Sequence, residues 1–369
     1  MTHVTGLGDL PWWRRSPIFP YYCHIIIGRG LLSHNQHGFR ANKSTISNLM
    51  TTYDYVTKQV DSNASVDVIL LDLAKAFDSV NHTLLIKKLL ELKMPNYLIK
   101  WINTFLSNRR QFVCVNRFKS KVLTVNSGVP QGTLLGPILF SLFINDIFSL
   151  PIHNELIAFA DDTKLFGQVS VNCSLQKDLD LVRNWFMVND LRLNSDKCKI
   201  LHFGHENHNH SYNLNNEYLT TSKVEKDLGI LIDTEFAFSE HINYVVKKAF
   251  LVSRFFIKSF SFQNIHQYSR LFTLYISPIL DYGYPLWFPK FVYQVDYLES
   301  VLKKFTKVVC RKLCITATYP ERLKLFKLDS LEIRLKLDVI FAFKLKHGWQ
   351  SLSLIYFPNS PLFLPDRLI

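Results

Sequence analysis

Two adjacent aspartates, Asp161 and Asp162, stand at the end of an apolar run in the segment LIAFADDTKLF (156–166). The runs on both sides are short and apolar, so the segment predicts a strand from about 155 and a second strand that turns back. Two like charges at the tip of such a hairpin repel each other and lose hydration, which is unfavourable unless a cation or hydrogen bonds compensate. The feature therefore favours a sheet with a metal site at one edge.

A third aspartate, Asp72, ends another apolar run, VDVILLDL (66–73), whose composition indicates a strand covered on both faces. If the two strands are neighbours, three carboxylates converge and can hold two Mg²⁺ ions roughly 3.5 to 4 Å apart, as in-line phosphoryl transfer requires. Hard oxygen ligands suit Mg²⁺, with Mn²⁺ as the alternative ion. The residues alone leave a plainer interpretation open, in which Asp side chains cap a tight turn and Asp72 is an unrelated residue.

The remaining pattern predicts an α+β chain with two or three subdomains. Strand 198–203 and a strand pair near 216–232 are expected to complete a mixed sheet, and the periodicity beyond Phe238 is helical. Helices are expected at 44–60, 81–93, 95–106, after Pro137 and at 174–190, and a hairpin is expected at 110–126.

Charge points to a polyanionic partner. The net charge is +13, and the segment from His241 onward holds 19 basic and 8 acidic residues, which is +11 of that total. Such asymmetry favours nucleic acid or an anionic membrane surface. No signal peptide is apparent and no run reaches the roughly 18 apolar residues of a membrane span, so we expect no membrane partner. The cysteine spacing suits reduced thiols in a nuclear or cytoplasmic protein.

Basic residues recur on one expected helix face in this last third. Lys303, Lys307 and Arg311 are spaced by four residues, with Lys304 and Lys312 beside them, so they can face a phosphate backbone together. An ordinary solvated helix face is the alternative. Aromatic residues nearby, such as Phe305 and Trp287, either pack beneath this face or stack on bases.

Ordered motif blocks then identify a family. The blocks are QHGFRANKST (36–45), LLDLAKAFDSVNH (70–82), SGVPQGTLLGPILF (127–140), AFADDTKLF (158–166), LRLNSDKCKILHFG (191–204) and KDLGILID (226–233). With these blocks in this order, the chain resembles the reverse transcriptase of a non-LTR retrotransposon, of the LINE type and close to the jockey-like group.

The resemblance implies a right-hand polymerase: partial fingers over 1–66, a palm with an antiparallel sheet and packed helices over 67–235, and a helical thumb and C-terminal region over 236–369. The implied activity is RNA-directed DNA synthesis on an RNA template with a DNA primer and deoxynucleoside triphosphates. Asp72, Asp161 and Asp162 would be the metal-binding triad, with Asp162 the weaker ligand.

Other roles are carried over residue by residue. Phe77 would be the steric gate that excludes a 2′-hydroxyl, or else an ordinary core residue. Gln131 and Gly132 would line the nucleotide pocket, assisted by the Leu73 carbonyl. Lys197 is a candidate general acid for the leaving pyrophosphate, with a solvated surface lysine as the alternative. Arg40 would touch the template or the triphosphate, or would pair within the fingers.

Two departures from the family pattern matter. The first fingers block is not found, and RRSPIFPYYCHIIIG (14–28) looks like a stand-in, so we expect an N-terminally truncated copy. An endonuclease would have to come from another chain. The alternative function is a catalytically inactive, element-derived protein that binds nucleic acid; a di-metal nuclease is a third hypothesis that only the carboxylates support.

Overall fold

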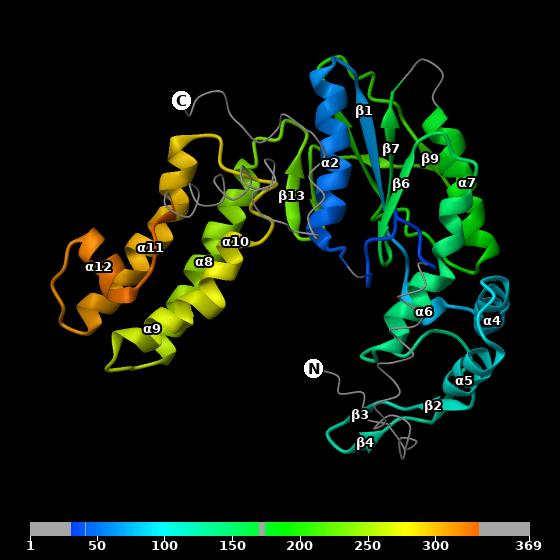
Figure 1. The fold of residues 1–369 in the computed structure, drawn as a ribbon, viewed down its shortest axis with the longest axis horizontal. Helices are drawn as coiled ribbons and strands as arrows, with labels where there is room; N and C mark the ends of the chain where they lie inside the picture. The colour runs from blue at the N-terminus through cyan, green and yellow to red at the C-terminus, as the bar shows by residue number, and fades with distance from the viewer. Residues whose placement is uncertain (1–30, 41, 170–173, 332–369) are drawn as a thin grey trace. The chain divides into compact units, whose positions relative to one another are not determined.

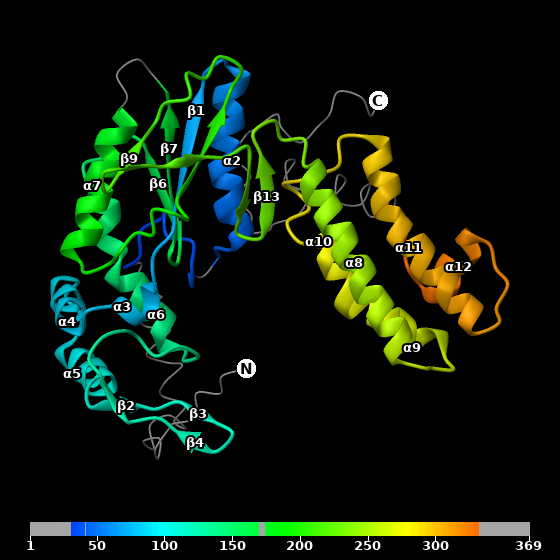
Figure 2. The ribbon, with the colours of Figure 1, turned by 180° about the vertical axis from the view of Figure 1, so that it is seen from behind.

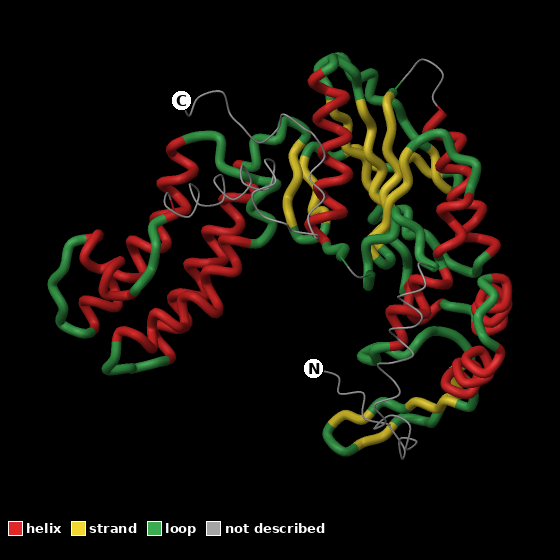
Figure 3. The backbone as a smooth tube through the Cα atoms, viewed as in Figure 1, coloured by secondary structure: helices red, strands yellow, loops and turns green. Residues whose placement is uncertain are grey.

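The computed structural model describes residues 31–331 except 41 and 170–173, so the stretch 14–28 lies outside the described residues (Figure 1). The chain divides into two compact units, residues 1–222 and 223–369. The first unit carries a five-stranded sheet and the second is mainly helical (Figure 3). The predicted α+β class is confirmed.

The sheet of the first unit has the strand order β11-β8-β1-β7-β6. All neighbouring pairs are antiparallel except β11 and β8, which are parallel, so the sheet is mixed as predicted. The central strand β1 has a neighbour on each side. The strands are β1 (Val66–Leu71), β6 (Glu155–Phe159), β7 (Asp162–Gln168), β8 (Lys199–Phe203) and β11 (Thr220–Thr221).

Both faces of this sheet are covered, which explains the almost continuous apolar run of β1. On one face, Ile69 and Leu71 belong to a core that includes Leu179 of α7 (Ser174–Val188). On the other face, Tyr53 and Tyr55 of α2 (Thr45–Asp61) make ring contacts with Phe203 and Phe166. Helix α2 begins where the sequence predicted, because Ser44 forms a capping box with Ser47.

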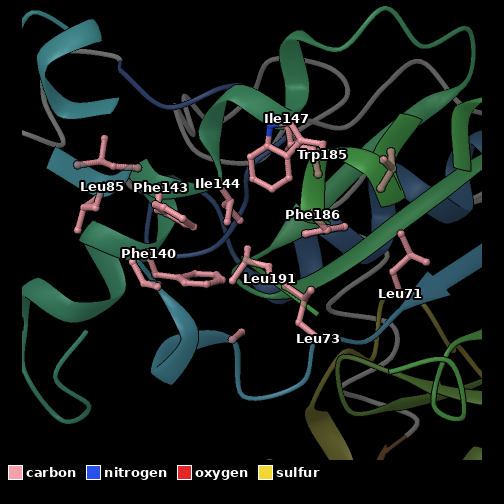
Figure 4. Packing of buried hydrophobic residues seen from close by; sticks show 14 of the residues in the cluster. Leu71, Leu73, Leu85, Phe140, Phe143, Ile144, Ile147, Trp185, Phe186 and Leu191 are labelled. Atoms are coloured by element: carbon pink, nitrogen blue, oxygen red, sulfur yellow. The ribbon is translucent and has the colours of Figure 1, made fainter. Parts of the chain in front are cut away.

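A cluster of helices continues the first core. It contains α3 (Ala76–Ser79), α4 (His82–Glu91), α5 (Asn96–Leu106), α6 (Leu135–Phe143) and the short helix η2 (Asn145–Ser149). Figure 4 shows how Phe140 and Phe143 of α6 and Trp185 and Phe186 of α7 pack in this core, with Leu71 and Leu73 at its edge. Buried apolar contacts with this core therefore fix the end of β1.

The predicted hairpin at 110–126 is a narrow β-ribbon that follows α5. Strand β2 (Arg109–Gln111) pairs with β5 (Leu123–Val125), and β3 (Cys114–Val115) pairs with β4 (Phe118–Lys119). The ribbon extends from the helical cluster away from the five-stranded sheet (Figures 1 and 2).

The strands near 216–232 differ from the prediction. Strands β12 (Val224–Asp227) and β13 (Ile230–Asp233) form a separate two-stranded sheet in the second unit, and β10 (Glu217–Tyr218) pairs with β9 (Asn213–Leu214). Both pairs are closed by two-residue turns whose residues have positive φ, Leu228-Gly229 and Asn215-Asn216. Such turns favour local pairing, so only β11 joins the large sheet from this part of the chain.

The second unit packs two long helices, α8 (Ser239–Ser259) and α11 (Val292–Lys312), with shorter ones. These are α9 (Ile265–Leu271), the π-helical turn η3 (Phe272–Ile276), α10 (Ser277–Asp281) and α12 (Tyr319–Phe326). Phe305 and Trp287 are buried in this unit, so base stacking is wrong for both and packing is their role. None of the helices within the described part of the chain is long and apolar enough to span a bilayer.

Candidate active site

Sheet register brings the predicted aspartates to one place. Leu71 at the end of β1 pairs with Thr163 of β7, so Asp72 emerges beside the start of β7, where Asp162 lies. Phe159 pairs with Asp162, which makes Ala160-Asp161 the two-residue turn that joins β6 to β7 at the same end of the sheet. The predicted hairpin with carboxylates at its tip is therefore confirmed in its geometry.

Asp72 and Asp161 at this end lie in surroundings that are unfavourable for negative charge. Burial raises the pKa of Asp161, and the negative charge of Asp72 adds to that rise. The Oδ2 atom of Asp72 is buried and accepts no hydrogen bond within the described residues. The Nζ atom of Lys197 lies 3.7 Å from this oxygen, which is an ion-pair distance rather than a hydrogen bond. Buried carboxylate oxygens without donors are unfavourable unless something else supplies positive charge.

A divalent cation fits this donor set, although the protein does not form a complete cage. Across the described ranges, no three Asp, Glu, His or Cys side chains come together closely enough to enclose an ion by themselves. Asp162 is exposed, whereas Asp161 is half-buried. Mg²⁺ commonly takes one or two carboxylates and completes its shell with water and substrate phosphates, so an open arrangement of this kind suits it.

A strap formed by residues 192–198 holds Asp72 in position. The Asn194 amide donates to the Asp72 carbonyl at 2.9 Å, and the Ala74 amide donates to the Arg192 carbonyl at 2.8 Å. The Asp72 amide donates to Sγ of Cys198 at 3.4 Å. Burial raises the pKa of the Cys198 thiol to about 11, so this group stays neutral beside the carboxylate. The same strap places Lys197 near Asp72, as its predicted role requires.

Two residues that the sequence analysis gave no role, Gln36 and Gly38, hold the aspartate turn. The buried Gln36 accepts hydrogen bonds through Oε1 from the amides of Ala160 at 3.1 Å and Gly38 at 2.7 Å. A Cβ at Gly38 would overlap with the backbone nitrogen of Ala160. Ala160 itself has a φ of 56°, which is unfavourable for a residue with a side chain. The turn is therefore fixed from outside by the segment 35–38.

Arg40 lies just beyond this segment. Its guanidinium donates to the Ser33 carbonyl, which is the structural pairing that the sequence left open. Nearby, burial lowers the pKa of His37 to about 3, assisted by the charge of Lys43. His37 is therefore neutral at pH 7, and its ring contacts Ser47 Oγ at 2.8 Å.

The predicted nucleotide-pocket residues come together on another loop. The amide of Val129 donates to the Phe77 carbonyl at 2.8 Å, which ties the loop after the ribbon to α3. Nε2 of Gln131 donates to Asp78 Oδ1 at 3.0 Å. Gly132 has a φ of 73° and open space where a Cβ would be, so its backbone conformation rather than crowding favours glycine.

Phe77 is half-buried and stacks on Phe140, with ring centroids 4.6 Å apart at 26°. One face of the ring is thus used for packing, and the ring is not fully enclosed. Leu73 is buried and bridges to Leu193 of the strap. Both residues lie within a few positions of Asp72, as their predicted roles require.

The five basic residues predicted to bind nucleic acid are all exposed on α11. Two of them have structural contacts: Lys312 donates to the carbonyls of Ile257 and Phe260 at 2.9 and 2.6 Å, and Lys303 pairs with Asp296 at 3.5 Å. Lys304 lies over the ring of Phe250. Among the described residues, Lys307 and Arg311 are the members of this set that are exposed without such a contact.

Comparison with known proteins gives a consistent result. A family model described as reverse transcriptase (RNA-dependent DNA polymerase) matches residues 24–244. The RNA-directed DNA polymerase from the mobile element jockey of Drosophila melanogaster is 30% identical over 226 residues, covering 57% of this chain and 24% of the relative. The probable RNA-directed DNA polymerase from transposon BS of the same species is 25% identical over 292 residues, covering 71% and 31%.

The chain thus spans about a quarter to a third of the length of these curated relatives. Among solved structures, apo telomerase from Candida tropicalis aligns with a TM-score of 0.45 and 13% identity, covering 60% of this chain and 45% of that chain.

Proposed function

The chain belongs to the reverse transcriptase (RNA-dependent DNA polymerase) family, and from this premise we propose that it copies RNA into DNA as the polymerase of a LINE-type retrotransposon. Divalent-metal dependence and an RNA template follow from the family in general. The specific substrates are a DNA primer and deoxynucleoside triphosphates. We propose a nuclear or cytoplasmic location.

One observation carries the proposal: at the end of the sheet, the buried Oδ2 of Asp72 accepts no hydrogen bond from the described residues, and burial together with the Asp72 charge raises the pKa of Asp161. When bound there, two Mg²⁺ ions would supply Lewis acidity to the primer hydroxyl and to the leaving phosphates. Asp72 and Asp161 would be the main protein ligands, and the exposed Asp162 the weaker one.

The reaction is an in-line transfer. The primer 3′-hydroxyl loses its proton to water and its oxygen attacks the α-phosphate, the bond to the β-phosphate breaks, and pyrophosphate leaves with the displaced charge. Lys197 lies 3.7 Å from Asp72 Oδ2 and is largely exposed. Its ammonium is well placed to deliver a proton as negative charge builds on pyrophosphate.

The loop residues would position the nucleotide. The Phe77 ring would lie under the sugar and exclude a 2′-hydroxyl, while its stacking on Phe140 keeps the ring in place. Gln131 and the backbone at Gly132 and Leu73 would contact the nucleotide. Arg40, held through Ser33, would approach the template or the triphosphate.

We also propose the division of the chain into polymerase subdomains. Residues 1–66 would be partial fingers, 67–235 the palm and 236–369 the thumb with the C-terminal region. The basic face of α11 would contact the phosphate backbone of the template-primer duplex, mainly through Lys307 and Arg311. A catalytically inactive nucleic-acid-binding derivative is not favoured, because the family members matched are polymerases.

The test is primer extension with purified protein on an RNA template, with a DNA primer, deoxynucleotides and Mg²⁺. The matched control carries Asp161→Ala and Asp162→Ala. We expect extension by the unmodified chain and none by the double variant or with a chelator. A folded chain that binds the template-primer but never extends it would contradict the proposal.

A further inference from the structure

The β-ribbon of residues 109–125 has a composition that the active site does not explain. It contains five basic residues and no acidic residue; these are Arg109, Arg110, Arg117, Lys119 and Lys121. It also exposes apolar side chains, since Val115 is 52% and Phe118 is 82% exposed. Exposed apolar groups among several cations, with no acidic residue nearby in sequence, indicate an interaction surface rather than a solvated loop.

Two of the exposed apolar groups share one side of the ribbon. Val115 and Phe118 are directly opposed in the β3–β4 pair, so their side chains project from the same face. Lys119 is opposed to Cys114 on the other face, and its ammonium lies over the ring of Phe112 at 5.3 Å. The ribbon therefore combines an open aromatic face with Lys119 on the opposite face and Arg117 in the turn at the tip.

The turn at the tip strengthens the argument. Asn116 and Arg117 have φ values of 47° and 72°, a conformation that normally selects Asn-Gly. A side chain at the second position is unfavourable by about 1 kcal/mol, yet arginine stands there. A strained cation beside the most exposed aromatic of the described residues suggests selection for contact with a ligand.

We propose that this ribbon binds single-stranded nucleic acid, with a base stacked on Phe118 and phosphates contacted by Arg117, Lys119 and Lys121. The positive charge of the ribbon favours a polyanion as the ligand. The exposed ring favours unpaired bases, because stacking within a duplex leaves no base face open to it. The inference depends on the proposed function only for the identity of the strand, which would be the RNA template. Single-stranded RNA and DNA share the chemistry that the ribbon recognises.

A second hairpin in the same unit supplies a matched control. In the β9–β10 hairpin, the turn Asn215-Asn216 also has positive φ, and Tyr218 in the following strand is 74% exposed. Residues 213–218 contain Glu217 and no cation. Truncation of Tyr218 therefore removes an equally exposed aromatic from an equally tight hairpin that lacks the basic setting.

The experiment measures binding of labelled single-stranded RNA and DNA by fluorescence anisotropy, with the full chain carrying Asp72→Asn so that no synthesis occurs. We expect Phe118→Ala to weaken binding about fivefold or more, and Tyr218→Ala to leave it unchanged. The pair Lys119→Gln and Lys121→Gln should lower the salt dependence of log Kd by about 1.4, since each phosphate contact with a single strand contributes about 0.7.

Arg117→Gly separates binding from folding. Because glycine fits the turn, the variant should be at least as stable as the parent while its binding falls. Equal weakening with RNA and DNA supports a general single-strand surface, and a loss confined to RNA supports a template contact. Unchanged binding of both single strands in the Phe118 and lysine variants would overturn the inference. Failed primer extension with these effects intact would contradict only the proposed function.

Discussion

Two aspartates, one on the central strand of the sheet and one just past its end, have opposite surroundings. Asp67, near the start of β1, is fully buried, and its carboxylate lies 2.6 Å from His202 Nδ1, 2.8 Å from Asn207 Nδ2 and 2.6 Å from the Tyr212 hydroxyl. Asp72, just past the end of β1, has a buried Oδ2 that receives no hydrogen bond from the described residues. Five positions apart, one carboxylate is satisfied by the fold and the other is not.

The difference separates a structural carboxylate from a functional one. A buried charge that serves the fold is surrounded by donors, because leaving it unpaired would destabilise the protein. A buried carboxylate oxygen that accepts no hydrogen bond, and has only the largely exposed Lys197 at an ion-pair distance, indicates a site for a further cation. Exposure alone would not identify it, because Asp72 is only half-buried and Asp67 is the more buried of the two.

The largest expected effect is on catalysis. Asp72→Asn should reduce single-nucleotide incorporation by about 10⁴-fold, because loss of a metal ligand removes several kcal/mol of transition-state stabilisation. The thermal midpoint should not fall, since no hydrogen bond to Oδ2 is lost. Incorporation within tenfold of the unmodified rate would show that Asp72 does not hold the metal.

A substitution of Asp67, at the other end of β1, should lower the stability of the protein. Asp67→Ala removes the common acceptor of His202, Asn207 and Tyr212 and should lower the free energy of unfolding by about 3 to 5 kcal/mol. Urea denaturation followed by circular dichroism measures this, and Tyr212→Phe should give a smaller loss of about 1 kcal/mol. Activity per folded molecule should be retained in the milder variant. If Asp67→Ala were as stable as the unmodified chain, Asp67 would not be a structural carboxylate in contrast to Asp72.

The third effect tests whether the turn that carries Asp161 must be held in place. Gly38→Ala pushes on the backbone of Ala160 and should displace the turn that carries Asp161. Incorporation should fall by about 10²-fold, since a shift of 1 Å in a catalytic group costs about that much. Template-primer affinity, measured separately, should stay the same. An unchanged rate would mean that the turn tolerates movement.

The smallest effect concerns pH and stability. The pKa of Asp161 is raised in the folded state, so the folded protein holds its proton more tightly than the unfolded chain does. The stability that this provides is present below the ordinary carboxyl pKa and is lost as the pH rises through the raised value. Asp161→Asn should therefore increase the thermal midpoint at pH 7 without metal.

The matching control for Asp161→Asn is a melt with added Mg²⁺. The unmodified chain should gain a concentration-dependent increase in its midpoint that the variant lacks, because an ion that binds only the folded state stabilises it. Equal increases in both proteins would place the ion elsewhere.

Local patterns were sufficient to predict much of this site. The apolar runs that end at Asp72 and at Asp161 predicted both strands, and their shared sheet edge followed once β1 and β7 were neighbours. The helix beginning after Ser44 was predicted from its cap. These features depend on periodicity and on residues close in sequence, so they can be predicted before the fold is known.

Contacts over long sequence separations could not be predicted in this way. Gln36 reaches Ala160 across 124 positions, and the donors to Asp67 lie 135 to 145 positions away. In the sequence, Asp67 and Asp72 are both aspartates in one apolar run, and periodicity cannot distinguish them. The QHGFR block did mark the segment that fixes the turn, but only Arg40 within it suggested chemistry.

The most direct measurement compares metal uptake by these two aspartates. Mn²⁺ binding is followed by electron paramagnetic resonance with template, chain-terminated primer and a matching deoxynucleotide, for the unmodified chain, Asp67→Asn and Asp72→Asn. A sample without protein corrects for ions held by the nucleotide. We predict protein-dependent uptake by the unmodified chain and by Asp67→Asn, and a marked loss in Asp72→Asn. Equal uptake by all three proteins would contradict the assignment of the metal site to the end of β1.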